Sequence, residues 1–267
     1  MKRNYLVVAA LLLVCLTTVV QPQNPAVREA KPEEVPFAYN AADFGKVEIE
    51  SVAKIEAEGP GSFPEDAPAH SCFHLKDARP LPALDQGPRY FYPAYSSVCI
   101  IPLTDSSVRD FAKSYPSVTK AAAKLRKLLN TRPRRFKFYD DIFDLPYNNA
   151  AGTILSRVEY LPFKTGKGVL FLTQYSQDTL PSPVNNEELT CVFQGLSSDG
   201  KFYVAARLAI THPSLPKGID FTDLSEADKN RLYLRRAEQS LNKVAEDSFR
   251  PSLKNLKSLF ASIATNQ

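Results

Sequence analysis

Tryptophan is absent from the 267-residue chain, and glycine is scarce, with 10 residues against 21 prolines. The sequence has no Gly-rich dinucleotide or phosphate loop, and it lacks the His-Glu-Xaa-Xaa-His and Gly-Xaa-Ser-Xaa-Gly motifs. A strong charge of one sign is also lacking, because the formal net charge is only +4 and Lys2 and Arg3 supply two of those charges. These absences argue against the enzyme classes that the motifs define. They also argue against a dedicated nucleic-acid binder, which usually carries a strongly basic domain.

The N-terminus has the pattern of an export signal. Lys2 and Arg3 precede a run from Tyr5 to Val20 that contains no charged residue. A basic start followed by an apolar segment is typical of a secretory signal, and this run is shorter than the ~20 residues that span a bilayer comfortably. We therefore predict that residues 1–23 are a signal peptide, with a retained N-terminal membrane anchor as the alternative. Cys15 leaves lipid attachment open as a third possibility.

The remaining chain divides into two parts. Residues 24–43 are rich in Pro, Glu, Ala and Lys and have few large apolar side chains, so we expect a disordered tether. Residues 44–267 are long enough for one domain with a sizeable core. An exported domain would be secreted, periplasmic or held at the membrane by its N-terminus.

Strand-like runs dominate the middle of this domain. Earlier runs lie at 45–57, 70–75 and 89–102, and four more lie at 153–161, 169–175, 189–194 and 202–210. The last two of these are joined by Ser198-Asp199-Gly200-Lys201, and Asp-Gly between apolar runs is a strong hairpin signal. Lys164-Thr165-Gly166 predicts another turn. We therefore expect an antiparallel meander.

Apolar residues recur at helical spacing in three segments, one before and two after the last four strand-like runs. These segments lie at 118–129, 234–245 and 253–263, and Ser117 is a plausible N-cap for the first. Strands followed by helices favour the α+β class, with the amphipathic helices packed on one face of the sheet.

The cysteines predict a disulfide in an oxidising compartment. Cys72 and Cys99 both lie in strand-like runs and are the favoured pair, whereas Cys191 lies between apolar neighbours and is expected to be a buried thiol. The alternative for Cys72 is a small metal site. In an extended strand His70, Cys72 and His74 point to the same face, and such ligands would suit zinc or copper.

Basic residues gather on the first predicted helix and just after it. The sequence from Phe111 to Tyr139 contains no acidic residue. The candidate binding residues are Lys120, Lys124, Lys127, Arg132, Arg134 and Arg135. Such a face could attract anionic lipid or acidic polysaccharide. The alternative is a solvated helix face balanced by Asp140, Asp141 and Asp144.

A hydrolase would need a nucleophile, and one weak candidate exists. The order of Ser117, Lys120 and Lys164 along the chain resembles the order of the catalytic Ser and Lys motifs in penicillin-binding enzymes and serine β-lactamases. The segment between Lys120 and Lys164 is too short for the helical domain of that family. We therefore assign no catalytic residue and expect no cofactor.

One stretch carries a family resemblance. It includes Gln174-Tyr175, Asn185-Asn186-Glu187-Glu188-Leu189, Phe193-Gln194-Gly195-Leu196 and His212-Pro213. From Phe171 to His212 it resembles a stretch of exported bacterial proteins to which no activity is assigned. The resemblance implies a bacterial cell-envelope protein and brings no activity with it. We expect a non-catalytic binding or accessory module, with an extracytoplasmic hydrolase or a small metal-binding protein as the alternatives.

Overall fold

The computed structural model describes residues 27–56, 66–76, 96–137, 140–142, 145, 150–176, 184–216 and 227–265. The side chains of residues 176 and 227–231 are not described. The predicted signal peptide, residues 1–23, lies outside the described residues.

The centre of the protein is an eight-stranded sheet in which all neighbouring strands are antiparallel. Across the sheet the strands are β1 (Val27–Glu29), β2 (Val47–Val52), β3 (His70–Leu75), β4 (Ser96–Pro102), β10 (Phe202–Ala209), β9 (Thr190–Ser197), β7 (Gly166–Thr173) and β6 (Ser156–Phe163). Two meanders therefore meet where β4 pairs with β10. A small second sheet pairs β5 (Ala151–Gly152) with β8 (Tyr175–Ser176). The antiparallel sheet expected from the sequence is confirmed.

Tight turns join β9 to β10 and β6 to β7. Gly200 has a φ of +72°, which suits a residue without a Cβ, and its N–H donates to Ser197 O at 3.0 Å. At the other hairpin, Lys164 and Thr165 form the turn between β6 and β7. Both turns fall where the sequence predicts them.

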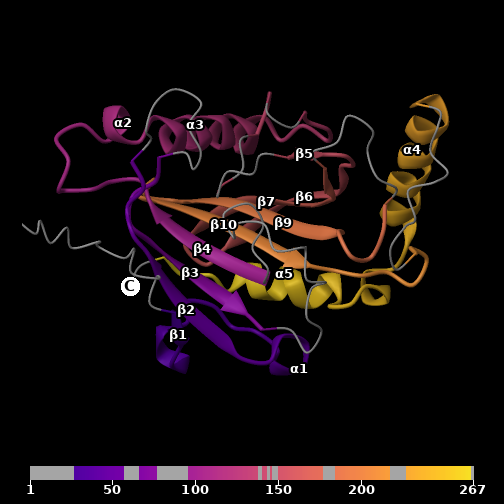
Figure 1. Ribbon diagram of the computed structural model, residues 1–267, viewed down its shortest axis with the longest axis horizontal. Helices are drawn as coiled ribbons and strands as arrows, with labels where there is room; N and C mark the ends of the chain where they lie inside the picture. Colours follow the sequence, from indigo (N-terminus) through magenta and orange to yellow (C-terminus); the bar gives the residue numbers. More distant parts are fainter. Residues whose placement is uncertain are drawn as a thin grey trace, which may run out of the picture.

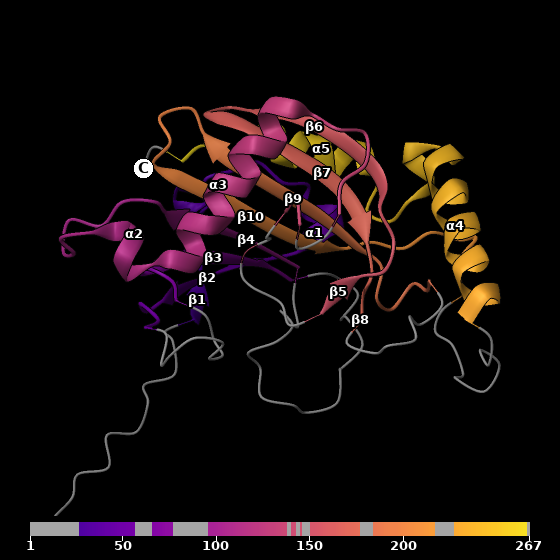
Figure 2. The ribbon, with the colours of Figure 1, turned by 90° about the horizontal axis from the view of Figure 1, so that it is seen from above.

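Helices cover both faces of the sheet, which corrects the prediction that they pack on one face. α3 (Pro116–Thr131) lies over one face and α5 (Leu253–Ala261) lies against the other (Figure 1). Seen from above, α3 crosses the sheet obliquely (Figure 2). The other helices among the described residues are α1 (Ala41–Phe44), α2 (Phe111–Ser114), α4 (Ala227–Lys243) and the single-turn helices η1 (Pro32–Glu34) and η3 (Glu246–Ser248).

The alternation of side chains along each strand builds two separate cores. In β7, Leu170 and Leu172 belong to the core on the α5 side, while Val169 and Phe171 belong to the core on the α3 side. All four side chains are fully buried. An uninterrupted apolar run in a strand is the pattern of a sheet buried on both faces, so the sequence did contain the signal for two layers of helices.

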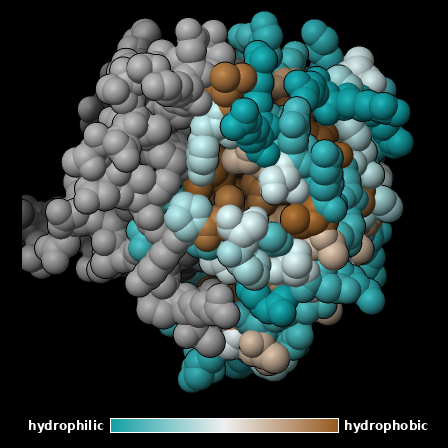
Figure 3. Space-filling view, turned by 90° about the vertical axis from the view of Figure 1, so that its right-hand side faces the viewer, coloured by the Kyte–Doolittle hydropathy of each residue, from teal (hydrophilic) through white to brown (hydrophobic). Residues whose placement is uncertain are grey.

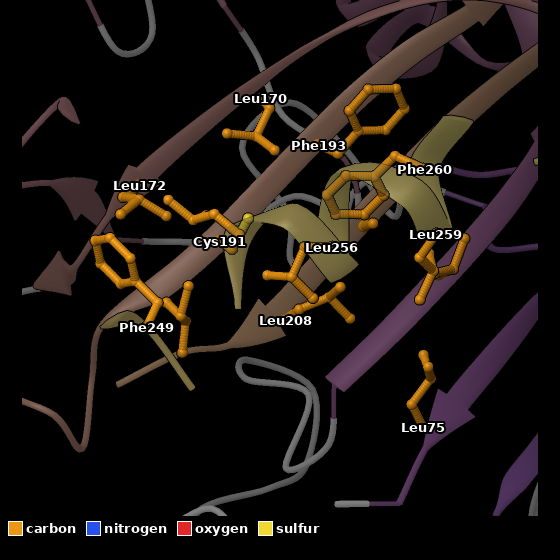
Figure 4. Close-up of a cluster of buried hydrophobic side chains, with 14 of the residues drawn as sticks. Leu75, Leu170, Leu172, Cys191, Phe193, Leu208, Phe249, Leu256, Leu259 and Phe260 are labelled. Atoms are coloured by element: carbon orange, nitrogen blue, oxygen red, sulfur yellow. The ribbon is translucent and has the colours of Figure 1, made fainter. Parts of the chain in front are cut away.

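Aromatic packing joins α5 to the sheet. Phe193 of β9 stacks on Phe260 of α5 with ring centroids 4.7 Å apart (Figure 4). The Phe193 ring lies against the backbone of β7 at Gly168, where an added Cβ would come within 2.4 Å of the ring. Cys191 points into the same cluster. Full burial of such rings contributes on the order of 2–3 kcal/mol each.

The segment expected as a tether is partly ordered. Residues 27–43 form β1, η1 and most of α1. Phe37 is only 6% exposed and packs edge-on against Phe73 of β3, with centroids 5.8 Å apart. Pro36 O accepts a hydrogen bond from Ala264 N at 2.8 Å. Phe37, with Val35 and Tyr39 packed against the same core, anchors a segment whose average composition is polar.

α4 stands at one end of the sheet, beyond β6 (Figures 1 and 2). From this end, hydrophobic side chains are visible in the middle of the surface, with hydrophilic ones above, below and to the right of them (Figure 3). Among the described residues the exposed large hydrophobic side chains are Val27 and Leu232, and Leu232 lies on α4. The apolar surface seen here therefore comes mostly from side chains that are partly buried.

Candidate binding surface

Cys72 and Cys99 are joined by a disulfide in the structure. They lie directly opposite each other on β3 and β4, with Cα atoms 4.1 Å apart, and both are buried on the α3 side. Cys191 is a free, fully buried thiol, and burial raises its pKa well above the usual range. A buried and protonated thiol is a poor nucleophile, so Cys191 serves as a core residue.

The disulfide leaves no thiolate at Cys72 for the alternative metal site at His70, Cys72 and His74. Cys72 has no thiolate to donate, because its sulfur is bonded to Cys99. His70 Nδ1 lies 2.8 Å from Pro68 O, and His74 Nε2 lies 2.6 Å from a carboxylate oxygen of Glu50. Within the described ranges, no three His, Cys, Asp or Glu side chains are placed to hold a metal ion.

The Glu50–His74 pair bridges β2 and β3. The hydrogen bond from His74 lowers the pKa of Glu50 below its usual value. Burial lowers the pKa of His70, which lies on the same face of β3. The geometry is that of a cross-strand hydrogen bond, which the sequence could not reveal because Glu50 is far from His74 along the chain.

His212 lies beside two serine hydroxyls, as the general base of a serine hydrolase would, but its hydrogen bond to Ser248 runs in the opposite direction. Its Nε2 lies 2.8 Å from Ser248 Oγ, and its Nδ1 lies 2.7 Å from Ser214 Oγ. Nδ1 accepts from Ser214 N–H at 3.1 Å, so Nε2 carries the proton of the neutral ring, and Ser248 Oγ–H donates to Ala245 O at 2.6 Å. His212 therefore donates to Ser248 and takes no proton from it. Burial lowers the pKa of His212, which keeps the ring neutral.

The polar residues of the resemblance stretch satisfy local backbone groups. Asn185 Oδ1 accepts from the N–H groups of Glu187 and Glu188, and Asn186 Nδ2 donates to His212 O. Gln174 Oε1 accepts from Asn185 N–H, and Gln194 hydrogen-bonds both backbone groups of Leu145. Gln174 and Gln194 are fully buried. These residues position turns and strands and offer little to a ligand.

The strongest candidate for binding is the outward side of α3 and the chain just after it. We call Lys120, Lys124, Lys127, Arg132, Arg134 and Arg135 the α3 basic surface. Five of the six are exposed, and Lys124 is half-buried. The apolar residues of α3 face the sheet, and Val118, Ala121 and Leu125 are fully buried. Because Lys120, Lys124 and Lys127 follow the helical repeat, they lie in a row on the opposite side.

The chain after α3 is fixed to the sheet with its arginines outward. Arg132 adopts a left-handed conformation with φ +45°, and its N–H donates to Leu128 O at 2.8 Å, which ends the helix. Pro133 O accepts from the hydroxyl of Tyr160 on β6 at 2.7 Å. Phe136 is buried and packs edge-on against Phe171 of β7. Arg134 lies between these two anchors and is exposed.

The arginines after α3 and Lys127 at its C-terminal end are weakly paired or lack an acidic partner among the described residues. Arg135 pairs with Glu238 of α4 at 3.7 Å, but the arginine side chain is 82% exposed, so the pair is weak. In the part of the chain that the structure describes, Lys127, Arg132 and Arg134 have no acidic partner within ion-pair distance. Asp141, expected to balance the charge, accepts from Lys137 N–H, and Asp144 lies outside the described residues. Like charges on neighbouring helix turns cost stability, so the row weakens α3 slightly.

The structure adds a residue that sequence reasoning missed. Lys167 of β7 is exposed, and its Nζ donates to Asn130 of α3 at 3.2 Å. Strand pairing and helix packing bring it beside the α3 basic surface, and no local pattern in the sequence indicates this.

The nucleophile set does not come together. The N–H of Ser117 in the first turn of α3 binds the carboxylate of Asp66, which caps the helix in place of the predicted Ser117 side chain. Lys164 lies in the β6–β7 turn, whose neighbour Lys167 contacts the other end of α3. Since an α-helix rises 1.5 Å per residue, the length of α3 holds Ser117 about 20 Å from that end.

No known protein family, curated protein or solved structure matches the chain. Within the described residues, no helix combines the length and apolar character needed to cross a bilayer.

Proposed function

We propose that the protein is a non-catalytic binding module of the cell envelope, exported to an oxidising compartment, and that its α3 basic surface holds an anionic partner. The single observation that supports the proposal is a row of outward cations on a helix whose apolar side is fully buried. Like charges on neighbouring turns cost helix stability, and an anionic partner would offset that cost.

The location rests on separate observations. The basic and apolar N-terminal segment is the pattern of an export signal. The Cys72–Cys99 disulfide fits an oxidising compartment, because such bonds are rare in the cytosol. Fractionation of cells that express the full chain tests the location. Recovery of the unprocessed protein in the cytosol, with both thiols reduced, would overturn it.

Binding is tested on columns of dextran sulfate and of neutral dextran. The chain is expected to bind the sulfated matrix alone and to elute as salt rises, because screening weakens exposed charges. The double variant Lys127→Gln/Arg134→Gln should elute at clearly lower salt. The matched control Lys243→Gln/Lys254→Gln removes two exposed lysines from α4 and α5 and should elute with the wild type. Equal elution of both variants would overturn the assignment of the surface.

A further inference from the structure

We infer that the partner of the α3 basic surface is a linear acidic polysaccharide that runs along α3 and continues past Asn130 to Lys167. The inference rests on the proposed function and specifies the chemical class and the path of the ligand.

The cations form a line. Lys120, Lys124 and Lys127 lie along the axis of α3, and Arg132, Arg134 and Arg135 continue beyond its last turn. The helix part of this line from Lys120 to Arg132 is about 18 Å long. That length is about twice the Debye length at physiological salt, so one compact anion cannot engage both ends. A polymer with repeated charges can engage all of them.

Lys167 extends the line onto the sheet. Its hydrogen bond to Asn130 places a seventh cation next to the C-terminal half of α3. Asn130 and Thr131 are exposed at the same point, and their side chains are polar. Amide and hydroxyl groups next to cations suit a ligand that carries hydroxyls between its charges.

A membrane fits this surface less well. An interfacial helix inserts its apolar side into lipid, but the apolar side of α3 is buried against the sheet. The exposed large hydrophobic residues of the described chain, Val27 and Leu232, belong to β1 and α4. Among the described residues, the α3 basic surface therefore has charges for a polyanion and no exposed large hydrophobic side chain that would anchor it in lipid.

Single-stranded nucleic acid is also a poorer fit. Proteins that bind it stack bases on exposed aromatic rings. On this side of the molecule Tyr115 and Phe136 are buried, at 2% and 7% exposure. The low net charge of the whole chain argues in the same direction.

The test compares polygalacturonate, a galacturonate disaccharide and vesicles that contain phosphatidylserine, each titrated into the full chain by calorimetry. The polymer should bind far more tightly than the disaccharide at equal uronate concentration, because only the polymer spans the line. Lys167→Gln should weaken polymer binding about five-fold and leave the disaccharide unchanged. Lys254→Gln, an exposed lysine on α5, is the matched control and should change neither.

The outcomes separate this inference from the proposed function. Tight binding to vesicles but not to polygalacturonate would overturn the polysaccharide and keep the anionic partner. Polymer binding without length dependence, or unaffected by Lys167→Gln, would overturn the extended path. If none of the three ligands binds, both the inference and the proposed function fail.

Discussion

Reducing the Cys72–Cys99 disulfide should destabilise the protein without changing its fold. The two cysteines face each other across neighbouring strands, and β3 is also held by its hydrogen-bonded ladders to β2 and β4. The native sheet therefore does not need the bond to keep its register. The bond acts chiefly on the unfolded chain, where it closes a loop between residues 27 positions apart.

The magnitude follows from that separation. The chain-entropy relation gives about 3.5 kcal/mol for a loop of this length. For a domain of this size, 1 kcal/mol shifts the melting temperature by roughly 2–4 °C, so reduction should lower it by about 10 °C.

The assay is urea unfolding of the full chain with and without reductant, followed by far-UV circular dichroism. Oxidised protein should unfold at higher urea, with the same native spectrum as the reduced form. Cys72→Ala/Cys99→Ala should match the reduced wild type or be slightly less stable, because both sites are buried, and it should not respond to reductant.

A non-reduced digest should contain a peptide that links Cys72 to Cys99 and leave Cys191 unlinked. Equal unfolding midpoints for the verified oxidised and reduced forms would refute the reasoning. A linkage that involves Cys191 would refute the structure of this region.

Three further predictions concern buried or capping groups. Asp66→Ala should cost about 1 kcal/mol in urea unfolding, because its carboxylate caps α3, whereas Asp110→Ala removes only the cap of the four-residue α2 and should cost less. Burial lowers the pKa of His212 in the folded protein, so the neutral ring stabilises the fold above the unfolded pKa of about 6.5 and this stability is lost as the pH falls below it. His212→Asn should therefore flatten the fall in the urea unfolding midpoint between about pH 7.5 and 5.5. A pH profile identical to that of the wild type would exclude this role. Cys191 should resist iodoacetamide at about pH 8 until urea unfolds the chain, and alkylation of the native protein would show that it is accessible.

Local patterns predicted the second meander well. Its strands and the turns at Lys164-Thr165 and Asp199-Gly200 are specified by residues close together in the sequence, so local patterns were sufficient to predict them. The stripe from Val118 to Leu129 likewise encodes α3. The layer arrangement differs from the prediction because the order of elements does not specify which face of the sheet a helix covers, although the continuous apolar run in β7 indicates two buried faces.

The structural features that the sequence did not predict depend on contacts between distant segments of the chain. The cap of α3 comes from Asp66, far upstream of Ser117, and the partner of His74 is Glu50 on another strand. Lys167 joins the α3 basic surface through a side-chain contact between a strand and a helix. None of these pairs has a fixed spacing that a sequence pattern could detect.

The most direct test of the central claim is an amide chemical-shift map of the full chain titrated with polygalacturonate. The account predicts that the perturbed amides lie between residues 120 and 137 and around Lys167, and that the shifts reverse as salt is added. Shifts concentrated on α5 around Lys254, or the absence of any shift on α3, would contradict it.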